Sequence, residues 1–114
     1  MLPKSYRLRK NNDFRITYKY GKSFSTKYLV LYIKKHHKDD SRVGFSISKK
    51  IGKANERNYL KRRLREIMRK KLPRVKSGHN LIFIARKGIT GIDFNEIEKN
   101  VEYLLNKGKL FNEE

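Results

Sequence analysis

The sequence predicts a single-domain α+β fold, an α-β sandwich in which helices pack on one small mixed sheet. The chain has 114 residues, of which 37% are hydrophobic, enough for one modest core spanning residues 1–114. Segments that alternate with a period of two lie between segments with helical spacing. Their order is α-β-β-β-α-β-α, which is typical of helices packed on a small sheet.

The chain begins with a basic stretch, residues 1–10, which we expect to be flexible. The first helix is expected over 12–20, and Gly21 ends it. Phe14 and Tyr18 are four positions apart and therefore share one face of this helix. Two aromatic rings are thus paired at the start of the fold.

Three strands are expected next: a short one over 23–25, one over 28–33 with β-branched and aromatic content, and one over 42–48 that alternates. The second strand places Tyr32 on the face opposite to its leucines. The polar loop 34–41 indicates a hairpin connection between the second and third strands. Alternation in the third strand gives a core-facing set and an opposite set of small side chains: Val43, Phe45 and Ile47, and Gly44, Ser46 and Ser48.

The second half of the chain predicts a helix over 54–72, a buried strand over 80–85 and a last helix. The last helix begins at Asp93, with Glu96 three positions on in a capping-box-like pair. Both helices carry an apolar stripe that can pack on the sheet: Leu60, Leu64, Ile67 and Met68 in the first, and Phe94, Ile97, Val101, Leu104 and Leu105 in the second.

The formal net charge is +19, from thirty Lys and Arg against eleven Asp and Glu. Residues 1–76 carry 25 basic and 5 acidic side chains, whereas residues 77–114 carry 5 basic and 6 acidic ones. Basic side chains release condensed counterions from phosphates, so this imbalance favours a polyanionic partner. The anion-binding surface is therefore expected in the first two-thirds of the chain.

The charge is densest over residues 49–71, which hold eleven basic and two acidic side chains in 23 positions. On a helix, four of them repeat every fourth position and make a cationic ridge about 18 Å long, at ~1.5 Å rise per residue. Arg side chains on such a ridge can grip RNA phosphates bidentately. The expected RNA-binding residues are Lys49, Lys50, Lys53, Arg57, Asn58, Lys61, Arg62, Arg65 and Arg69.

A solvated helix face is the simpler interpretation of these charges. Solvated faces usually mix both signs in i, i+4 pairs. Here Glu56 and Glu66 cannot balance so many basic neighbours, and the pattern favours binding.

The motif Arg57-Asn58-x-x-Lys61-Arg62-x-x-Arg65-Glu66 resembles the Arg-Asn-Arg signature of bacterial ribonuclease P proteins. The strand and loop over 42–54, the Asn12-Asp13-Phe14 opening and the Ile84-Ala85-Arg86-Lys87 strand end also look like that family. These blocks occur in order over nearly the whole chain. Asn55 and Glu56 depart from the family pattern, in which an apolar residue and a variable one are common.

The resemblance implies a protein subunit of ribonuclease P, with a left-handed βαβ crossover around the basic helix. General rules favour the opposite hand. It further implies two partners, the ribonuclease P RNA and precursor tRNA, whose 5′ leader would lie in a cleft between the first helix and the sheet. The RNA would hold Mg²⁺ and hydrolyse the phosphodiester that frees the mature tRNA 5′ end. The protein itself would supply no catalytic residue.

The residues expected in that cleft are Phe14, Tyr18, Tyr32, Ser46, Ser48 and Lys87. Aromatic faces near lysines suit single-stranded RNA. From spacing alone, the aromatic residues are more simply read as core, and Lys87 as a plain surface residue. The resemblance favours the cleft for Phe14, Tyr18 and Tyr32.

A nuclease acting alone is the main alternative in chemistry. His36, His37, Asp39 and Asp40 are its most enzyme-like groups, but four neighbours in one loop make a weak metal site. We therefore expect neither a metal site nor a catalytic group in the chain. A ribosomal or RNA-chaperone protein is the next interpretation, followed by a DNA-binding or membrane-surface protein.

The chain has no cysteine, no apolar run of transmembrane length and no signal-peptide pattern at its start. These observations fit a cytoplasmic protein without a membrane partner. No obligate protein partner is evident from the sequence.

Overall fold

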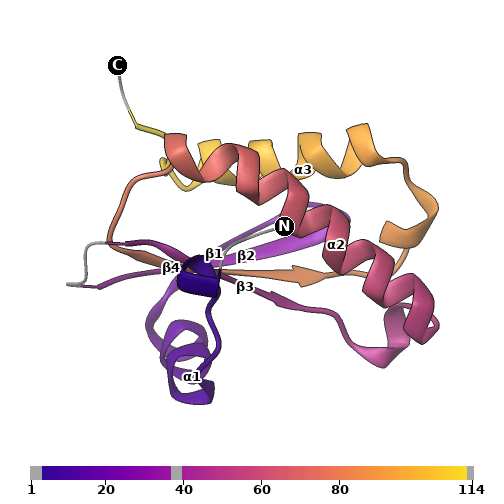
Figure 1. The fold of residues 1–114 in the computed structure, drawn as a ribbon, viewed down its shortest axis with the longest axis horizontal. Helices are drawn as coiled ribbons and strands as arrows, with labels where there is room; N and C mark the ends of the chain where they lie inside the picture. Colours follow the sequence, from indigo (N-terminus) through magenta and orange to yellow (C-terminus); the bar gives the residue numbers. More distant parts are fainter. Residues whose placement is uncertain (1–3, 37–39, 113–114) are drawn as a thin grey trace.

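A computed structural model of the chain describes residues 4–36 and 40–112 (Figure 1). The predicted order of elements is confirmed. The main elements are α1 (Asn11–Tyr20), β1 (Lys22–Ser25), β2 (Leu29–Lys35), β3 (Arg42–Ser46), α2 (Ala54–Lys71), β4 (His79–Ala85) and α3 (Phe94–Lys107). Short 3-10 turns precede α1, α2 and α3, and another follows α2.

The four strands form one mixed sheet in the order β1-β2-β4-β3. The last strand, β4, is antiparallel to β2 and parallel to β3, so it separates two strands that are neighbours in sequence. The predicted hairpin between β2 and β3 is therefore wrong. Two strands joined by a short polar loop usually pair, but here the buried strand β4 takes the place between them.

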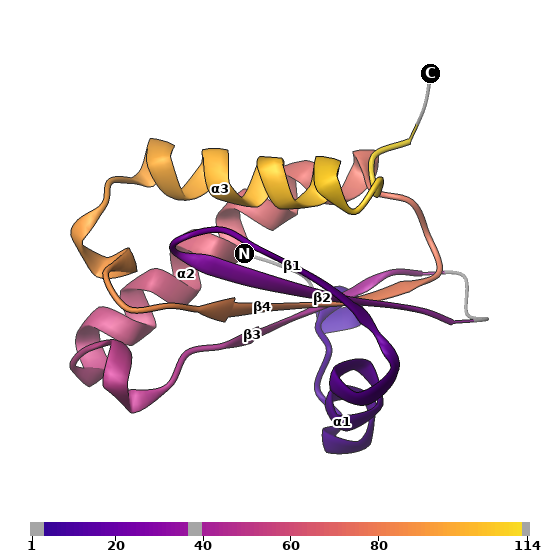
Figure 2. The same cartoon turned by 180° about the vertical axis from the view of Figure 1, so that it is seen from behind.

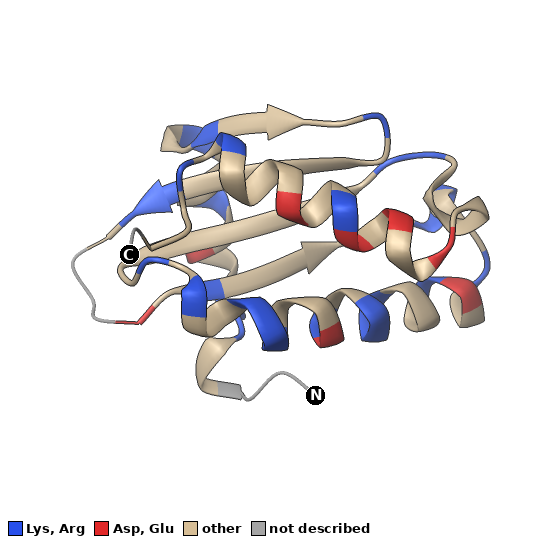
Figure 3. Ribbon diagram, turned by 90° about the horizontal axis from the view of Figure 1, so that it is seen from above, with Lys and Arg blue, Asp and Glu red and all other residues tan. Residues whose placement is uncertain are grey.

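The connection from β3 through α2 to β4 is left-handed, as the family resemblance implies. In Figure 3 the helices lie toward the viewer, β3 and β4 run in the same direction, and β4 lies to the left of β3 along that direction. Right-handed crossovers are the general rule, so spacing alone would have predicted the opposite hand.

The sheet has helices on both faces. Helices α2 and α3 cover one face and α1 lies on the other (Figures 1 and 2). The main core lies under α2 and α3, where alternate strand residues meet the stripes predicted for the two helices. Its fully buried side chains are Leu29, Leu31, Leu64, Ile67, Met68, Leu81, Phe83, Ile89, Val101, Leu104 and Leu105.

Two polar contacts fix the helices over this core. The Asp93 carboxylate caps α3 by accepting a hydrogen bond from the backbone N–H of Glu96, at 2.9 Å, as the sequence predicts. At the end of α2, the nearly buried Lys71 ammonium lies 3.8 Å from Glu98 and 3.6 Å from Glu102 of α3. This contact joins the C-terminal half of α2 to α3.

The segment 1–10, which the sequence predicts to be flexible, contacts the sheet through its middle part. Arg7 forms a parallel bridge with Val43 of β3, and the backbone N–H of Leu8 donates to the Val43 carbonyl at 2.9 Å. Leu8 is only 4% exposed. One apolar side chain in a basic stretch therefore docks the segment on the β3 edge, while residues 1–3 lie outside the described part.

Candidate nucleic-acid interface

The cationic row on α2 follows the predicted spacing, with Arg57, Lys61 and Arg65 half-buried along one side of the helix. Figure 3 shows Lys and Arg recurring along the length of α2. Arg57 Nη1 donates to the Gly52 carbonyl at 2.8 Å, which holds the preceding loop against the helix. Asn58 and Arg62 beside the row are exposed.

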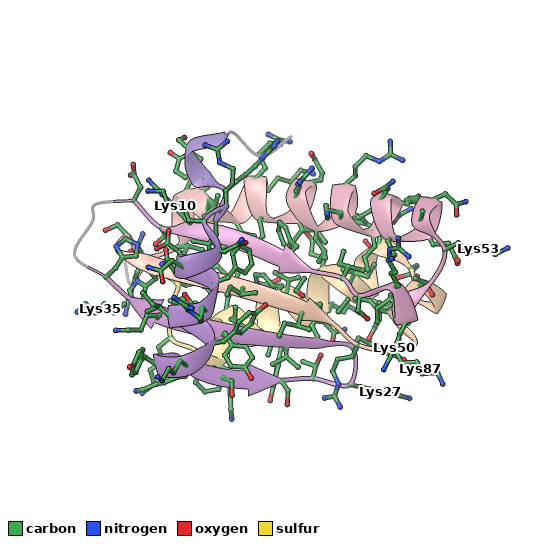
Figure 4. The ribbon with its side chains drawn as sticks, turned by 90° about the horizontal axis from the view of Figure 1, so that it is seen from below. Lys10, Lys27, Lys35, Lys50, Lys53 and Lys87 are labelled. Atoms are coloured by element: carbon green, nitrogen blue, oxygen red, sulfur yellow. The ribbon has the colours of Figure 1, made fainter. Side chains whose placement is uncertain are left out.

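The loop before α2 adds three exposed lysines, Lys49, Lys50 and Lys53. The first two lie in a 3-10 turn, and Glu56 Oε1 accepts a hydrogen bond from the Lys53 backbone N–H at 2.9 Å. In Figure 4, Lys50 and Lys53 project from the end of the molecule where α2 begins. The loop and the row therefore form one continuous basic surface.

Arg69, the last residue of the row, differs from the others because it has an acidic partner. It forms hydrogen bonds of 2.6 and 3.3 Å with the two carboxylate oxygens of Glu66. The hydrogen bond raises the pKa of Arg69 and lowers the pKa of Glu66. The positive charge of Arg69 is therefore already paired with a carboxylate within α2.

The N-terminal segment extends the basic surface beyond α2. A hollow of about 320 Å³ is lined by Ser5, Arg7, Arg9, Lys10 and Arg42, at the β3 edge. Burial, followed by the positive charge of Arg7, lowers the pKa of Arg65 in α2. The sequence interpretation missed this surface because it assigned the cations to a flexible tail.

The predicted aromatic residues come together on the other face of the sheet. The ring centroids of Phe14 and Tyr18 are 6.3 Å apart, and those of Tyr18 and Tyr32 are 5.2 Å apart in an edge-to-face arrangement. Among the described residues, the core cluster under α2 and α3 includes none of the three. Tyr18 is 37% exposed. The simpler reading of these rings as part of the main core is therefore wrong.

A glycine allows α1 to lie this close to the sheet. A Cβ atom on Gly44 of β3 would lie only 2.5 Å from Cζ of Phe14. The strand register places Gly44 beside Ile82, which lies beside Tyr32. The small side chain predicted for this face thus makes the seat of the Phe14 ring.

The next row along the sheet consists of Val30, Ile84 and Ser46, which are half-buried. We call these three residues, with Phe14, Tyr18 and Tyr32, the α1 face. Ser48 lies beyond the end of β3 and is exposed.

Lys87 does not lie beside α1. It follows the end of β4 at Ala85. Figure 4 shows Lys87 at the end of the sheet, together with Lys27 and Lys50. No local pattern in the sequence marks Lys27 as a site residue, because only the β2–β4 pairing brings the turn that holds it beside Lys87. In that turn, the Thr26 carbonyl accepts a hydrogen bond from Arg86 Nη1 at 3.0 Å.

Residues 4–36 and 40–112 contain no group of three or more His, Asp or Glu side chains arranged to hold a metal ion. Of the predicted enzyme-like loop, His37 and Asp39 lie outside the described residues. Within the described part, no helix is both long enough and apolar enough to span a bilayer.

Comparison with known proteins gives one consistent result. The family model described as ribonuclease P matches residues 2–109. The ribonuclease P protein component of Clostridioides difficile is 45% identical over 88% of this chain and 89% of its own length. That of Clostridium kluyveri is 44% identical over 93% of this chain and 96% of its own length.

The solved structures agree. The Staphylococcus aureus RNase P protein superposes with a TM-score of 0.87 at 34% identity, covering 96% of this chain and 100% of that one. Identity at this level over nearly the whole of both chains, with the same fold, establishes the family. The chain therefore belongs to the ribonuclease P family, as a protein component of that tRNA-processing ribonucleoprotein.

Proposed function

We propose that the two surfaces of this chain bind two different RNAs of the ribonuclease P reaction. The basic surface of α2, its preceding loop and the N-terminal segment binds the catalytic RNA. The α1 face binds the 5′ leader of precursor tRNA. The observation that carries the proposal is that Phe14, Tyr18 and Tyr32 come together on the α1 side of the sheet. The cationic row of α2 lies on the opposite side.

The chemistry of the two surfaces supports this division. Folded RNA presents closely spaced phosphates, which the cations at four-residue intervals on α2 can contact in succession. A single strand instead exposes unstacked bases, which aromatic rings can stack at about 1–3 kcal/mol per base. The small, half-buried side chain of Ser46 leaves room for a strand beside α1.

The lysines at the end of the sheet extend the leader's path. A strand that leaves the α1 face along β4 reaches Lys87, with Lys27 and Lys50 close by. These ammonium groups can contact its phosphates where the bases no longer meet an aromatic ring. The same end carries the loop before α2, so leader and catalytic RNA would meet there.

Catalysis is assigned to the RNA. The described side chains do not form a metal site, so no step of the proposal uses a metal held by this chain. The Mg²⁺ required for hydrolysis is held by the RNA, and the reaction takes place in the cytoplasm. The protein contributes by binding the leader and by neutralising phosphates that Mg²⁺ would otherwise have to screen.

Cleavage of a 5′-extended precursor tRNA at low Mg²⁺ tests the proposal. Three samples are compared: the protein alone, bacterial ribonuclease P RNA alone, and both together. We expect efficient cleavage at the mature 5′ end only in the mixture. Binding of RNA without any change in cleavage would favour the RNA-chaperone or ribosomal interpretation, and cleavage by the protein alone would contradict the assignment of catalysis to RNA.

A further inference from the structure

We propose that the groove between the first half of α2 and the start of α3 binds a nucleobase of RNA, stacked on Tyr59. The site lies on the helical side of the sheet, opposite the α1 face (Figures 1 and 2). The inference rests on the proposed function only in taking RNA as the partner. None of the RNA-binding residues expected from the sequence lines this groove.

The groove has the size and lining of a small-ligand site. Its volume is about 420 Å³, and Leu60, Ile89 and Ile97 form a buried apolar floor. Tyr59 from α2 and Phe94 from α3 form its aromatic walls. Pockets of roughly 300–1,000 Å³ with apolar floors and a few polar groups are typical ligand sites.

The walls offer a planar stacking surface with positive charge. The Arg63 guanidinium lies 4.2 Å from the ring centroid of Tyr59 and 5.4 Å from that of Phe94, and it also donates to the Tyr59 hydroxyl. Arg62 lies 5.8 Å from the centroid of the same ring. Tyr59 remains 42% exposed. An exposed ring with two arginines close by suits a nucleotide, whose base can stack while its phosphate pairs with a guanidinium.

The polar rim favours a base whose edge donates hydrogen bonds. Asp93 Oδ1 accepts from the Glu96 backbone and Glu56 Oε1 accepts from the Lys53 backbone. Within the described part of the chain, the second oxygen of each carboxylate has no hydrogen-bond donor. A carboxylate accepts two parallel hydrogen bonds from adjacent N–H groups. Guanine presents two such groups side by side, whereas uracil presents one.

Charge selects RNA over an apolar peptide as the occupant. The groove's own carboxylates would repel a phosphate, but Arg62 belongs to a second hollow that shares Tyr59, Arg63 and Phe94 with the groove. Arg62 also flanks the cationic row of α2. RNA bound along that row can therefore place its backbone on Arg62 and turn one base into the groove.

The test uses two hexaribonucleotides, UUGUUU and UUUUUU, titrated into the full-length ¹⁵N-labelled protein. Amide shifts over residues 89–97, on the α3 side, report binding in the groove separately from binding on the cationic row of α2 and on the α1 face. We expect these amides to respond to UUGUUU at lower concentration than to UUUUUU. Equal responses, or shifts confined to the α1 face, would overturn the inference.

Three variants sharpen the test. Tyr59→Leu should weaken groove binding of UUGUUU by about 5- to 150-fold, the loss expected for one stacked base. Tyr59→Phe should retain binding and confirm that folding is not the cause. Tyr103→Leu, which alters a 52% exposed tyrosine elsewhere on α3, should have no effect.

The rim is tested by Asp93→Asn, since asparagine keeps the cap of α3 but replaces one acceptor oxygen with a donor. It should abolish the preference for UUGUUU while leaving the melting temperature unchanged. A retained preference would exclude Asp93 and the guanine assignment. If these variants behave as wild type while precursor cleavage is normal, the inference fails and the proposed function stands. If the groove binds guanine but the protein does not stimulate cleavage, the proposed function fails and the groove inference stands.

Discussion

At the scale of single residues, the position of α1 depends on the absence of a side chain at Gly44. A Cβ atom there would lie 2.5 Å from Cζ of Phe14 and 2.9 Å from its Cε1. Gly44→Ala should therefore lower the free energy of unfolding by about 1–3 kcal/mol, as overpacking does. Denaturant unfolding measures the change.

Gly91→Ala is the matched control, because nothing lies within 4 Å of a Cβ at Gly91. It should leave stability almost unchanged. If both variants were equally stable, Phe14 would not need the close approach to β3.

Tyr18 carries the clearest residue-scale prediction about the leader. Its ring is partly exposed and meets Tyr32 edge to face, so Tyr18→Leu should preserve folding. It should weaken binding of precursor tRNA by about 1–3 kcal/mol, the value of one stacked base. The measurement compares the affinity of the protein–RNA complex for precursor tRNA and for mature tRNA, which has no leader.

Tyr20→Leu controls for the loss of an aromatic ring from α1. Tyr20 is 63% exposed and makes a cation-π contact with Lys19. It should leave leader binding unchanged. If Tyr18→Leu also lowered the affinity for mature tRNA, the assignment of Tyr18 to the leader site would be contradicted.

At the scale of elements, the role proposed for α2 is a row of separate phosphate contacts. Replacing Arg57, Lys61 and Arg65 together with Gln should weaken binding of ribonuclease P RNA. It should also reduce the slope of log K against log salt by about two to three, since each contact contributes roughly 0.7–0.9. Filter binding at several salt concentrations gives both quantities.

A triple replacement of Lys99, Lys107 and Lys109 with Gln removes the same charge from α3 and the turn after it. Its smaller effect on the slope would separate local contacts from net charge. An equal effect of the two triple variants would mean that α2 has no special place in the interface.

The sequence predicted the elements well for a physical reason. Periodicity is a local property, so the apolar stripe of α2 and the alternation in β3 fixed which residues face the core. The cap at Asp93 is local too, because donor and acceptor are three positions apart. The bounds of all three helices agree with the prediction to within one residue.

Strand order could not be predicted in this way. Whether β4 lies beside β3 or outside β2 depends on pairing between residues 38 or more positions apart, which leaves no periodic signal. The contact of Leu8 with β3 also depends on residues far apart in sequence. The same is true of the proximity of Lys27 to Lys87. Spacing could predict that Phe14 and Tyr18 share one face of α1, whereas the contact of the N-terminal segment with β3 leaves no local pattern.

At the scale of the whole molecule, charge and core are divided between two parts of one chain. Residues 1–76 carry 25 of the 30 basic side chains, whereas α3 contributes much of the apolar cover of the sheet. The cationic surfaces are thus held in place by a nearly neutral C-terminal part. A change in the packing of α3 away from the groove shared with α2 should therefore affect RNA binding only through loss of folding.

The central position of β4 in the sheet has a consequence for folding during synthesis on the ribosome. Synthesis proceeds from the N-terminus, so β1, β2 and β3 emerge before the strand that joins β2 to β3 exists. Non-local strand pairing of this kind is slow, because the chain loses the entropy of loop closure before the new contacts stabilise it. A fragment of residues 1–76 should consequently lack amide dispersion in NMR spectra, whereas the full chain should show it. The nascent chain would then remain unfolded until β4 is synthesised. Until that point its basic side chains would not form the phosphate-binding surface.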